Sequence, residues 1–430
     1  MSNIKRHLFS LIILFLSVET LAQTQGSSTD SLLIQRLNRL EQRADSLEKA
    51  LQETRARMVT HSQFEGILRS INEDDQEFTD NDRRSKRRAL DSLFKAAVKK
   101  PKQLTFTGQF LNVFQWDGKF DNSINSVVGT VDLFAISSFG QNSLVFINLQ
   151  GVGGNGPDKF FPNYSGFHGG AGTTQSGDGL DRINILEAWV EYSISNTSIT
   201  MGKIDLTNYY DPNSIANDEY SQFLSNGFVN SSALAARGNG PGMSINTELL
   251  NNFTFQVGVA SNDNSGDQIF QGLFMIAQLT ESFNINNVEK GAIRVYAYRN
   301  TEVKEGWGFG VSGDLRLTNK LYSYGRYGQN LDSLAGSFGV KRSWSGGLQL
   351  RNYQLIGSAS ISTGLAYGQT EGFSSMEGSD SEQEKMIEAY LRFNIKQAFF
   401  ISPHVQSIWD ARGQEGETIT IFGLRTRVAF

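Results

Sequence analysis

Hydrophobic and polar residues alternate with a period of two in short segments that follow one another from residue 104 to the C-terminus. Clusters of Gly, Asn, Asp and Ser separate these segments. Successive side chains of a β-strand point to opposite faces, so the period predicts strands with one apolar and one polar face, joined by turns. In residues 307–317, the apolar Trp307 and Phe309 alternate with glycines, and the polar face ends in Arg316.

Three other segments show which side chains share the face opposite the apolar one. In the first segment, residues 186–194, we expect Leu186 on the apolar face. The residues expected on the polar faces are Glu187, Trp189 and Glu191 in this segment, Arg294, Tyr296 and Tyr298 in residues 292–298, and Glu388, Tyr390 and Arg392 in residues 386–396.

Alternation of this kind occurs in soluble β-sandwiches and in membrane barrels. Three features favour the barrel: a signal for export, the lack of predicted helices that could cover a sheet, and aromatic residues near the strand ends, where barrels carry aromatic girdles. Residues 103–430 accommodate about sixteen strands, at about twenty residues for a strand and its connection. The sequence therefore predicts a transmembrane antiparallel β-barrel of about sixteen strands, with an aqueous channel inside.

Short connections alternate with long ones in this predicted barrel. The segments "SISNTSI" and "RLTNKLY" contain short turns, whereas residues 151–184 and 207–241 are long insertions. Outer-membrane barrels have short periplasmic turns and longer external loops. We expect the 207–241 insertion to fold into the pore.

The N-terminus predicts export. Lys5 and Arg6 precede an apolar stretch, Leu8–Val18, that is too short to span a bilayer, and Ala22 offers a small residue for cleavage. These features are typical of a secretory signal peptide, here residues 1–22.

Residues 27–61 predict an α-helical coiled coil. Apolar residues recur there at alternating steps of four and three, as in a heptad seam. A single helix docked on a core is the alternative. The leucines of the seam are Leu33, Leu37, Leu40, Leu47 and Leu51.

Residues 62–102 are expected to form a basic helical linker, and the second half, residues 80–102, carries nine Lys or Arg against three Asp. Such a run is usually solvated, and contact with anionic cell-envelope polymers is the alternative.

Composition excludes several classes of protein. The 430 residues include no cysteine, which excludes disulfide scaffolds and thiolate metal sites. A net charge of -5 argues against a nucleic-acid-binding protein. Beyond the N-terminus, no apolar run reaches the length of a membrane helix. The 43 glycines against 6 prolines suit a large antiparallel sheet with many turns.

The chain ends in "ETITIFGLRTRVAF", a strand with apolar residues on one face and Arg425 and Arg427 on the other. Arginine on a lipid-facing strand costs about 2–4 kcal/mol near the midplane, so we expect both to face the lumen. The terminal strand resembles the recognition signal that the bacterial barrel-assembly machinery reads. Its apolar positions are Phe422, Leu424, Val428 and Phe430.

Residues 201–235 carry a more specific resemblance. A Gly-Lys-hydrophobic-Asp strand end, Gly202 to Asp205, leads into an aromatic-Asp pair, an Ala-Asn-Asp-Glu run, a Gln-Phe-Leu run and a Val-Asn pair. This order resembles the carbohydrate-selective porin (OprB) family, and residues 186–194 and the C-terminal strand look similar to it as well. The resemblance implies a sixteen-stranded barrel that passes mono- and oligosaccharides. The N-terminal seam departs from the simplest members.

A sugar-selective pore needs hydrogen-bonding side chains and aromatic faces, and its binding must be weak enough for release. For each candidate below, the alternative is a side chain that merely solvates the wall or pins the loop. The expected pore-lining residues are Glu187, Trp189, Glu191, Lys203, Asp205, Asp211, Asn217, Asp218, Glu219, Gln222, Arg294, Arg316, Arg392, Arg425 and Arg427.

Several other motifs do not support a site. "GVGGNG" at 151–156 is followed by Pro157 without a predicted helix, which argues against a dinucleotide site. "DNSGD" at 263–267 lacks the spacing of a calcium loop. A hydrolase would need His168 or His404, and no spacing supports a triad. We expect no catalytic residue, metal or cofactor.

The sequence thus predicts a bacterial outer-membrane porin for small sugars. The alternatives are a general or anion-preferring porin, a structural tether between outer membrane and cell wall, and an outer-membrane hydrolase. The expected partners are small sugars, outer-membrane lipid and the assembly machinery, with no nucleic acid. A homotrimer, and contact of the coiled coil over residues 27–61 with peptidoglycan or another envelope component, are compatible with the pattern.

Overall fold

The computed structural model describes residues 104–118, 124–139, 142–170, 182–236, 238–250, 252–263, 265–285, 288–355, 359–373, 383–396 and 399–430. The expected signal peptide, coiled coil and basic linker lie outside these ranges, as do the leucines of the heptad seam.

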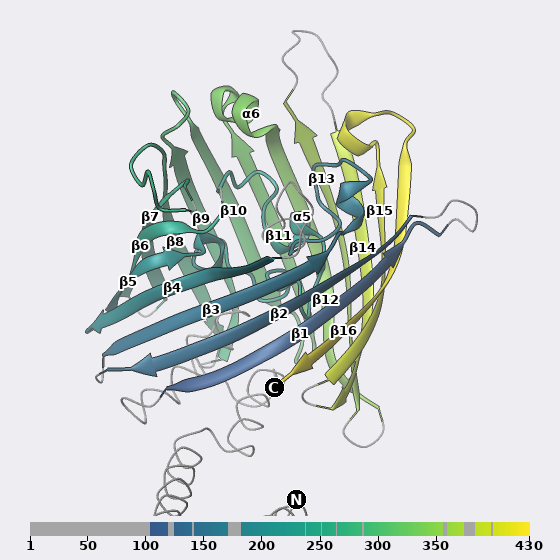
Figure 1. The fold of residues 1–430 in the computed structure, drawn as a ribbon, viewed down its shortest axis with the longest axis horizontal. Helices are drawn as coiled ribbons and strands as arrows, with labels where there is room; N and C mark the ends of the chain where they lie inside the picture. The colour runs from purple at the N-terminus through teal and green to yellow at the C-terminus, as the bar shows by residue number, and fades with distance from the viewer. Residues whose placement is uncertain are drawn as a thin grey trace, which may run out of the picture. The chain divides into compact units, whose positions relative to one another are not determined.

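Sixteen antiparallel strands form a closed barrel (Figure 1), as the alternation predicts. Each strand pairs with its neighbours in the chain, and the last strand pairs with the first. The strands are β1 (Thr105–Trp116), β2 (Asn125–Ser138), β3 (Ser143–Gly154), β4 (Arg182–Ile194), β5 (Thr197–Ile204), β6 (Gly240–Leu250), β7 (Phe253–Ser261), β8 (Leu273–Ile285), β9 (Val288–Asn300), β10 (Trp307–Arg316), β11 (Leu321–Asn330), β12 (Val340–Gln354), β13 (Ser360–Gly372), β14 (Gln383–Lys396), β15 (Phe399–Trp409) and β16 (Thr418–Ala429).

Helical elements are short in the described part of the chain. They are η1 (Pro157–Lys159), η2 (Leu206–Asn208), α5 (Asn226–Val229), α6 (Asp332–Phe338) and η3 (Ala411–Gly413). None of the helices in these residues has the length and apolar character needed to cross a bilayer.

Short and long connections alternate around the barrel, as expected. The β4–β5 and β10–β11 connections are short turns, whereas the β3–β4 and β5–β6 connections are long loops. We call the edge with the short turns the turn end and the opposite edge the loop end. Strand β1 begins at the turn end and β16 finishes there, so one edge carries both chain ends of the barrel.

The outward-facing side chains of the wall are mainly apolar, and several of them are aromatic. Trp307, Phe309 and Trp344 are 45%, 42% and 44% exposed, and the Trp344 ring lies 5.5 Å from that of Tyr367. In β16, Phe422, Leu424, Val428 and Phe430 point outward, whereas Arg425 is fully buried on the inner face. The expected division between an apolar outer face and a polar inner face is therefore confirmed for these strands.

The expected facing of Leu186 is wrong. A β-bulge in β4, between the pairs Asn148–Glu187 and Leu149–Ile185, leaves Leu186 opposite no partner. Ile185 then points outward, and Leu186 lines an internal cavity. Strict alternation could not reveal this, because a bulge inserts one residue and reverses the facing on one side of it.

The barrel closes at Gly108 and Phe430. Their backbones exchange two hydrogen bonds, with N···O distances of 2.8 and 2.9 Å. A Cβ on residue 108 would lie 2.7 Å from the Phe430 ring, so the ring lies directly over the glycine. The last residue of the chain thus completes the ladder between β16 and β1.

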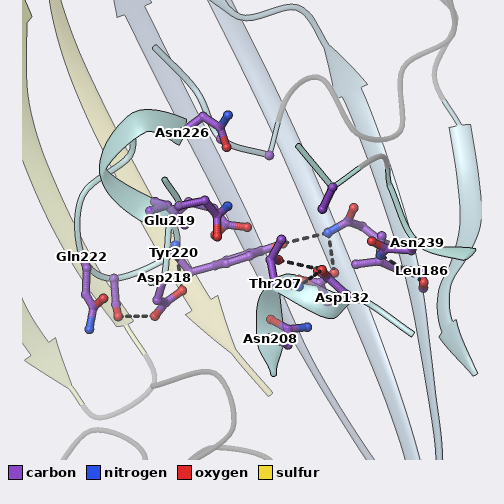
Figure 2. Close-up of a pocket in the computed structure, with 18 of the residues that line it drawn as sticks. Asp132, Leu186, Thr207, Asn208, Asp218, Glu219, Tyr220, Gln222, Asn226 and Asn239 are labelled. Carbon is purple, nitrogen blue, oxygen red and sulfur yellow. Dashed lines mark hydrogen bonds between the residues drawn. The ribbon is translucent and has the colours of Figure 1, made fainter. Parts of the chain in front are cut away.

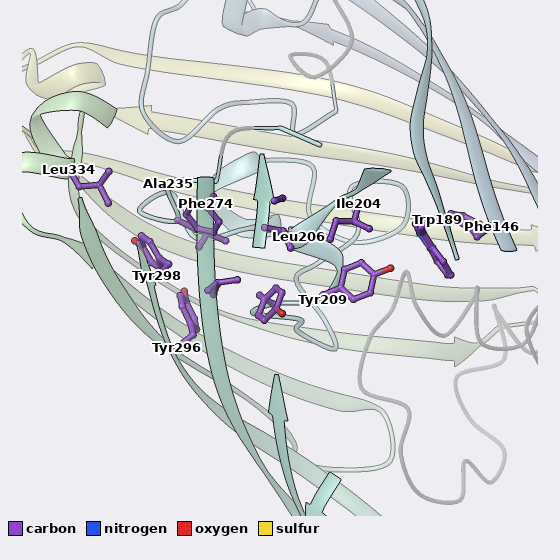
Figure 3. Packing of buried hydrophobic residues seen from close by; sticks show 14 of the residues in the cluster. Phe146, Trp189, Ile204, Leu206, Tyr209, Ala235, Phe274, Tyr296, Tyr298 and Leu334 are labelled. Atoms are coloured by element: carbon purple, nitrogen blue, oxygen red, sulfur yellow. The ribbon is translucent and has the colours of Figure 1, made fainter. Parts of the chain in front are cut away.

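Buried loop residues fill part of the lumen, so the expected aqueous space is narrowed. One buried cluster packs the β5–β6 loop against the inner wall of β8 and β9 (Figure 3), and it includes Tyr209, Tyr210, Phe274 and Tyr296. A second joins Phe223 and other loop residues to the inner wall of β11 and of β13 to β16. Only part of the cross-section stays open.

Glycine on the inner wall makes this packing possible. A Cβ at Gly310 would clash with the ring of Tyr296, and one at Gly258 would clash with Tyr210. The glycines that alternate with Trp307 and Phe309 therefore form a surface on which tyrosine rings lie, rather than a water-facing wall.

Candidate functional site

The β5–β6 loop, residues 205–239, is the element that shapes the interior, and Arg326 of β11 is one of its anchors. The guanidinium lies 2.6 Å from the Asp211 carboxylate, and both side chains are almost fully buried. It also donates to the backbone oxygens of Phe228, at 2.7 Å, and of Asp211 and Ala216, at 3.1 Å. One wall arginine thus fixes three points of the loop.

Arg425 and Arg392 hold the middle of the loop in the same way. Arg425 donates to the carbonyl oxygens of Glu219 and Gln222, both at 2.7 Å. Arg392 donates to the carbonyl oxygen of Ser221 at 2.7 Å. Since these donors are charged, each hydrogen bond is stronger than a neutral one.

Two glutamates of β14 hold backbone N–H groups. The Glu388 carboxylate accepts from Leu224 and Ser225, at 2.7 and 2.9 Å. The Glu384 carboxylate accepts from Tyr164 and Ser165 of the β3–β4 loop, both at 2.8 Å. Wall arginines therefore bind loop carbonyls and wall glutamates bind loop amides, so the docked conformation is specified at both kinds of backbone group.

The space that the loops leave open is a cavity of about 730 Å³ inside the barrel, and residues of β12 and β14 line it as well as those of β1 to β4. Its wall comes mainly from β1 to β4 and β16, and the β5–β6 loop faces it from within (Figure 2). The lining extends from Gly339 and Asn239 at the loop end to Thr107 and Ala429 at the turn end. The cavity therefore runs along the strands over much of their length.

A chain of hydrogen bonds crosses the wall of this cavity and continues to the loop. Arg427 donates to Gln109 at 2.9 Å, and Gln109 donates to Asp132 at 3.0 Å. Gln150 donates to Asp132 at 2.9 Å and to the Tyr220 hydroxyl at 3.2 Å. Figure 2 shows the Tyr220 side chain reaching from the loop toward Asp132.

Aromatic rings and further polar groups line the cavity beside this network. The rings of Phe134 and Phe146 stack with centroids 6.0 Å apart. The Glu187 carboxylate accepts from the Asn208 side chain at 3.1 Å and from the Asp205 backbone N–H at 3.2 Å. The cavity thus presents amides, carboxylates, guanidinium groups and apolar ring faces together.

The structure brings about half of the expected residues to this cavity. Those that line it are Glu187, Asp205, Asp218, Glu219, Gln222, Arg392 and Arg427. Others hold the loop or the wall instead. Asp211 pairs with Arg326, the Asn217 N–H donates to Gln222 at 2.8 Å, and Arg425 is buried beneath the loop.

The remaining expected residues lie elsewhere. Trp189 is buried against Phe146, and Glu191 accepts from Thr200 at 2.9 Å, both inside the wall but away from the cavity. Arg294 is buried in an ion pair with Asp314, at 2.7 Å. These side chains face inward, as expected, but they stabilise the wall.

Lys203 and Arg316 lie at opposite ends of the wall. Lys203, expected to line the pore, instead lies on the outward face of β5, two residues after the exposed Met201, at the loop end. Arg316 contacts the turn residues Thr318 and Asn319 at the turn end.

Sequence reasoning missed Asp132, Gln150, Tyr220, Glu384 and Arg326. Asp132 left a signal, since it is the only charged residue in the alternating segment 125–138. Tyr220 and Arg326 left none, because a loop contact cannot be inferred from strand periodicity.

His168 and His404 are 4% and 5% exposed, so neither presents an imidazole to a substrate. Burial, with a smaller contribution from the Arg425 guanidinium, lowers the pKa of His168 from 6.5 to about 4. The unfolded state therefore binds a proton between pH 6.5 and 4 that the folded state rejects, and stability falls as pH falls through this window.

We expect His168→Gln to reduce this acid sensitivity. The histidine contributes about 3 kcal/mol to the loss between neutral pH and pH 4. The measurement is thermal unfolding of the detergent-solubilised protein at pH 7 and pH 4.5. An equal drop in melting temperature for wild type and variant would contradict the assignment.

The chain was compared with protein families and with curated proteins by sequence. No protein-family model matches the chain. An uncharacterized protein of Aquifex aeolicus (strain VF5) is 26% identical over 149 residues, which are 35% of this chain, and the chain spans 44% of the length of that curated relative.

Two solved structures of OprB from Pseudomonas putida are similar in shape. The high-pH structure has a TM-score of 0.64 at 12% identity and covers 79% of this chain and 97% of that chain. The low-pH structure has a TM-score of 0.52 at 11% identity and covers 79% and 96%. At these identities the likeness establishes the fold, which is a porin barrel. The solute that the pore selects has to be inferred from the residues of the cavity.

Proposed function

We propose that the protein is a porin of the bacterial outer membrane that passes small carbohydrates by diffusion, with the cavity along β1 to β4 as the conduit. The observation that carries this proposal is the stacked pair Phe134–Phe146 next to the network of Gln109, Asp132 and Gln150. Ring faces match the apolar faces of sugars, and amides and carboxylates match their hydroxyl groups.

Liposome swelling and single-channel current test this function. We expect swelling with glucose and maltooligosaccharides, and partial block of the current by the sugar during its passage. Phe134→Ala should weaken the block by about five- to tenfold, since one aromatic contact contributes about 1 kcal/mol. Phe309→Ala, an aromatic change on the outer wall, is the matched control.

A current that sugar does not affect would favour the general or anion-preferring porin. No current at all would favour the structural tether, and the loop residues packed inside the lumen give that alternative its basis. We also propose that the protein forms a homotrimer and that the bacterial barrel-assembly machinery inserts it. The expected coiled coil, residues 27–61, would contact peptidoglycan or another envelope component.

A further inference from the structure

Among the described residues, four cationic side chains lie on the outer face of the barrel near its loop end: Lys203, Arg299, Arg342 and Lys385. A cation on the outer wall costs about 2–4 kcal/mol at the bilayer midplane and about 0–1 near the interfaces. These positions therefore fit the level of lipid headgroups, where a charge is tolerated and can meet an opposite one.

Arg299 differs from two of the others in its contacts. Arg342 pairs with Glu371, at 2.5 Å, and Lys385 pairs with Asp410, at 3.2 Å. Arg299 instead lies over the Trp307 ring, 5.3 Å from its centroid. Its Nε is buried and has no hydrogen-bond partner within the described ranges. An unsatisfied buried donor on a charged group is costly, so a small shift of the side chain that lets an acceptor from outside the chain reach the guanidinium would be favoured.

The residues around Arg299 indicate the direction from which an acceptor can approach. Met275 is its cross-strand neighbour on β8, and the exposed Val295 precedes it on the outer face of β9. The loop beyond the strand carries exposed Glu302 and Glu305 against one exposed Lys304, so its net charge disfavours an anion that approaches from that side. The open approach is along the apolar wall, from the membrane.

The charge on this wall differs between its two ends. Glu281, exposed on the outer face of β8, lies toward the turn end, whereas Arg299 lies at the loop end. An anionic group held at the membrane surface is thus favoured at one end and disfavoured at the other. Phosphate suits the guanidinium, which binds its oxygens in a bidentate manner.

We propose that Arg299 and Trp307 bind the phosphate of a lipid in the outer leaflet, whose acyl chains lie on the wall formed by β8 and β9. Arg299 donates to the phosphate oxygens, and the Trp307 ring supports the guanidinium. The inference rests on the proposed outer-membrane location and not on the sugar, so a barrel that passes no sugar would still retain the lipid.

Native mass spectrometry of the detergent-solubilised full chain tests this site, with bis-phosphorylated lipid A as the probe. We expect wild type to retain the lipid, and Arg299→Gln to weaken binding about tenfold, as for loss of a charged hydrogen bond. Arg299→Lys, which keeps the charge, should fall between them. Arg316→Gln, at the turn end, is the control and should bind as wild type does.

Three results would overturn the proposal: equal retention by Arg299→Gln, equal retention of lipid A from which both phosphates have been removed, or displacement by millimolar inorganic phosphate. The last would assign the site to free phosphate. Unchanged gel migration without heating shows that each variant is folded. Loss of lipid by a folded Arg299→Gln barrel supports the proposal.

Discussion

Replacement of Arg326 by methionine is expected to release the β5–β6 loop and raise the single-channel conductance several-fold. The substitution leaves the Asp211 carboxylate buried without its 2.6 Å partner and removes the donors to Phe228 and Ala216. Breaking a buried ion pair from one side costs about 3–5 kcal/mol. The docked loop loses that stabilisation, and the lumen that it fills becomes available to ions.

The measurements are conductance in planar bilayers and thermal unfolding in detergent. Arg316→Met is the matched control, because that arginine lies at the turn end and contacts turn residues. A variant at Arg326 with the conductance and melting temperature of wild type would show that other contacts hold the loop.

Replacement of Phe430 by serine is expected to reduce assembled barrel in cells more than any other single change at the terminal strand. The substitution keeps the two backbone hydrogen bonds to Gly108 and removes the exposed ring. If the assembly machinery reads that ring, the yield in the outer membrane drops strongly while refolding of the purified chain into detergent changes little. The two yields, compared for one variant, separate recognition from stability.

Gly108→Val is the complementary change. Its side chain would meet the Phe430 ring and the Asp132 backbone oxygen, at 2.7 and 2.9 Å from the Cβ, so closure of β1 on β16 is disturbed. Both yields should fall in this variant. Equal loss of both yields in Phe430→Ser would remove the case for a recognition signal.

The sequence by itself determined the barrel and the facing of most strands. The period of two separates outward Trp307 and Phe309 from inward residues because a strand has two faces and the bilayer accepts one of them. It also placed Arg425 and Arg427 inside, since lipid penalises guanidinium groups. The two long insertions, residues 151–184 and 207–241, predicted the long β3–β4 and β5–β6 loops.

Tertiary structure decided what the inward side chains meet. Arg425 binds the carbonyls of Glu219 and Gln222, and Glu388 binds the amides of Leu224 and Ser225, so side chains expected to border water border a loop instead. Strand periodicity reports only which side of the sheet a residue faces. The fold of an insertion and the wall that it covers depend on contacts between residues far apart in the chain, such as Arg326 with Asp211, and these exist only once the barrel has closed around the loop.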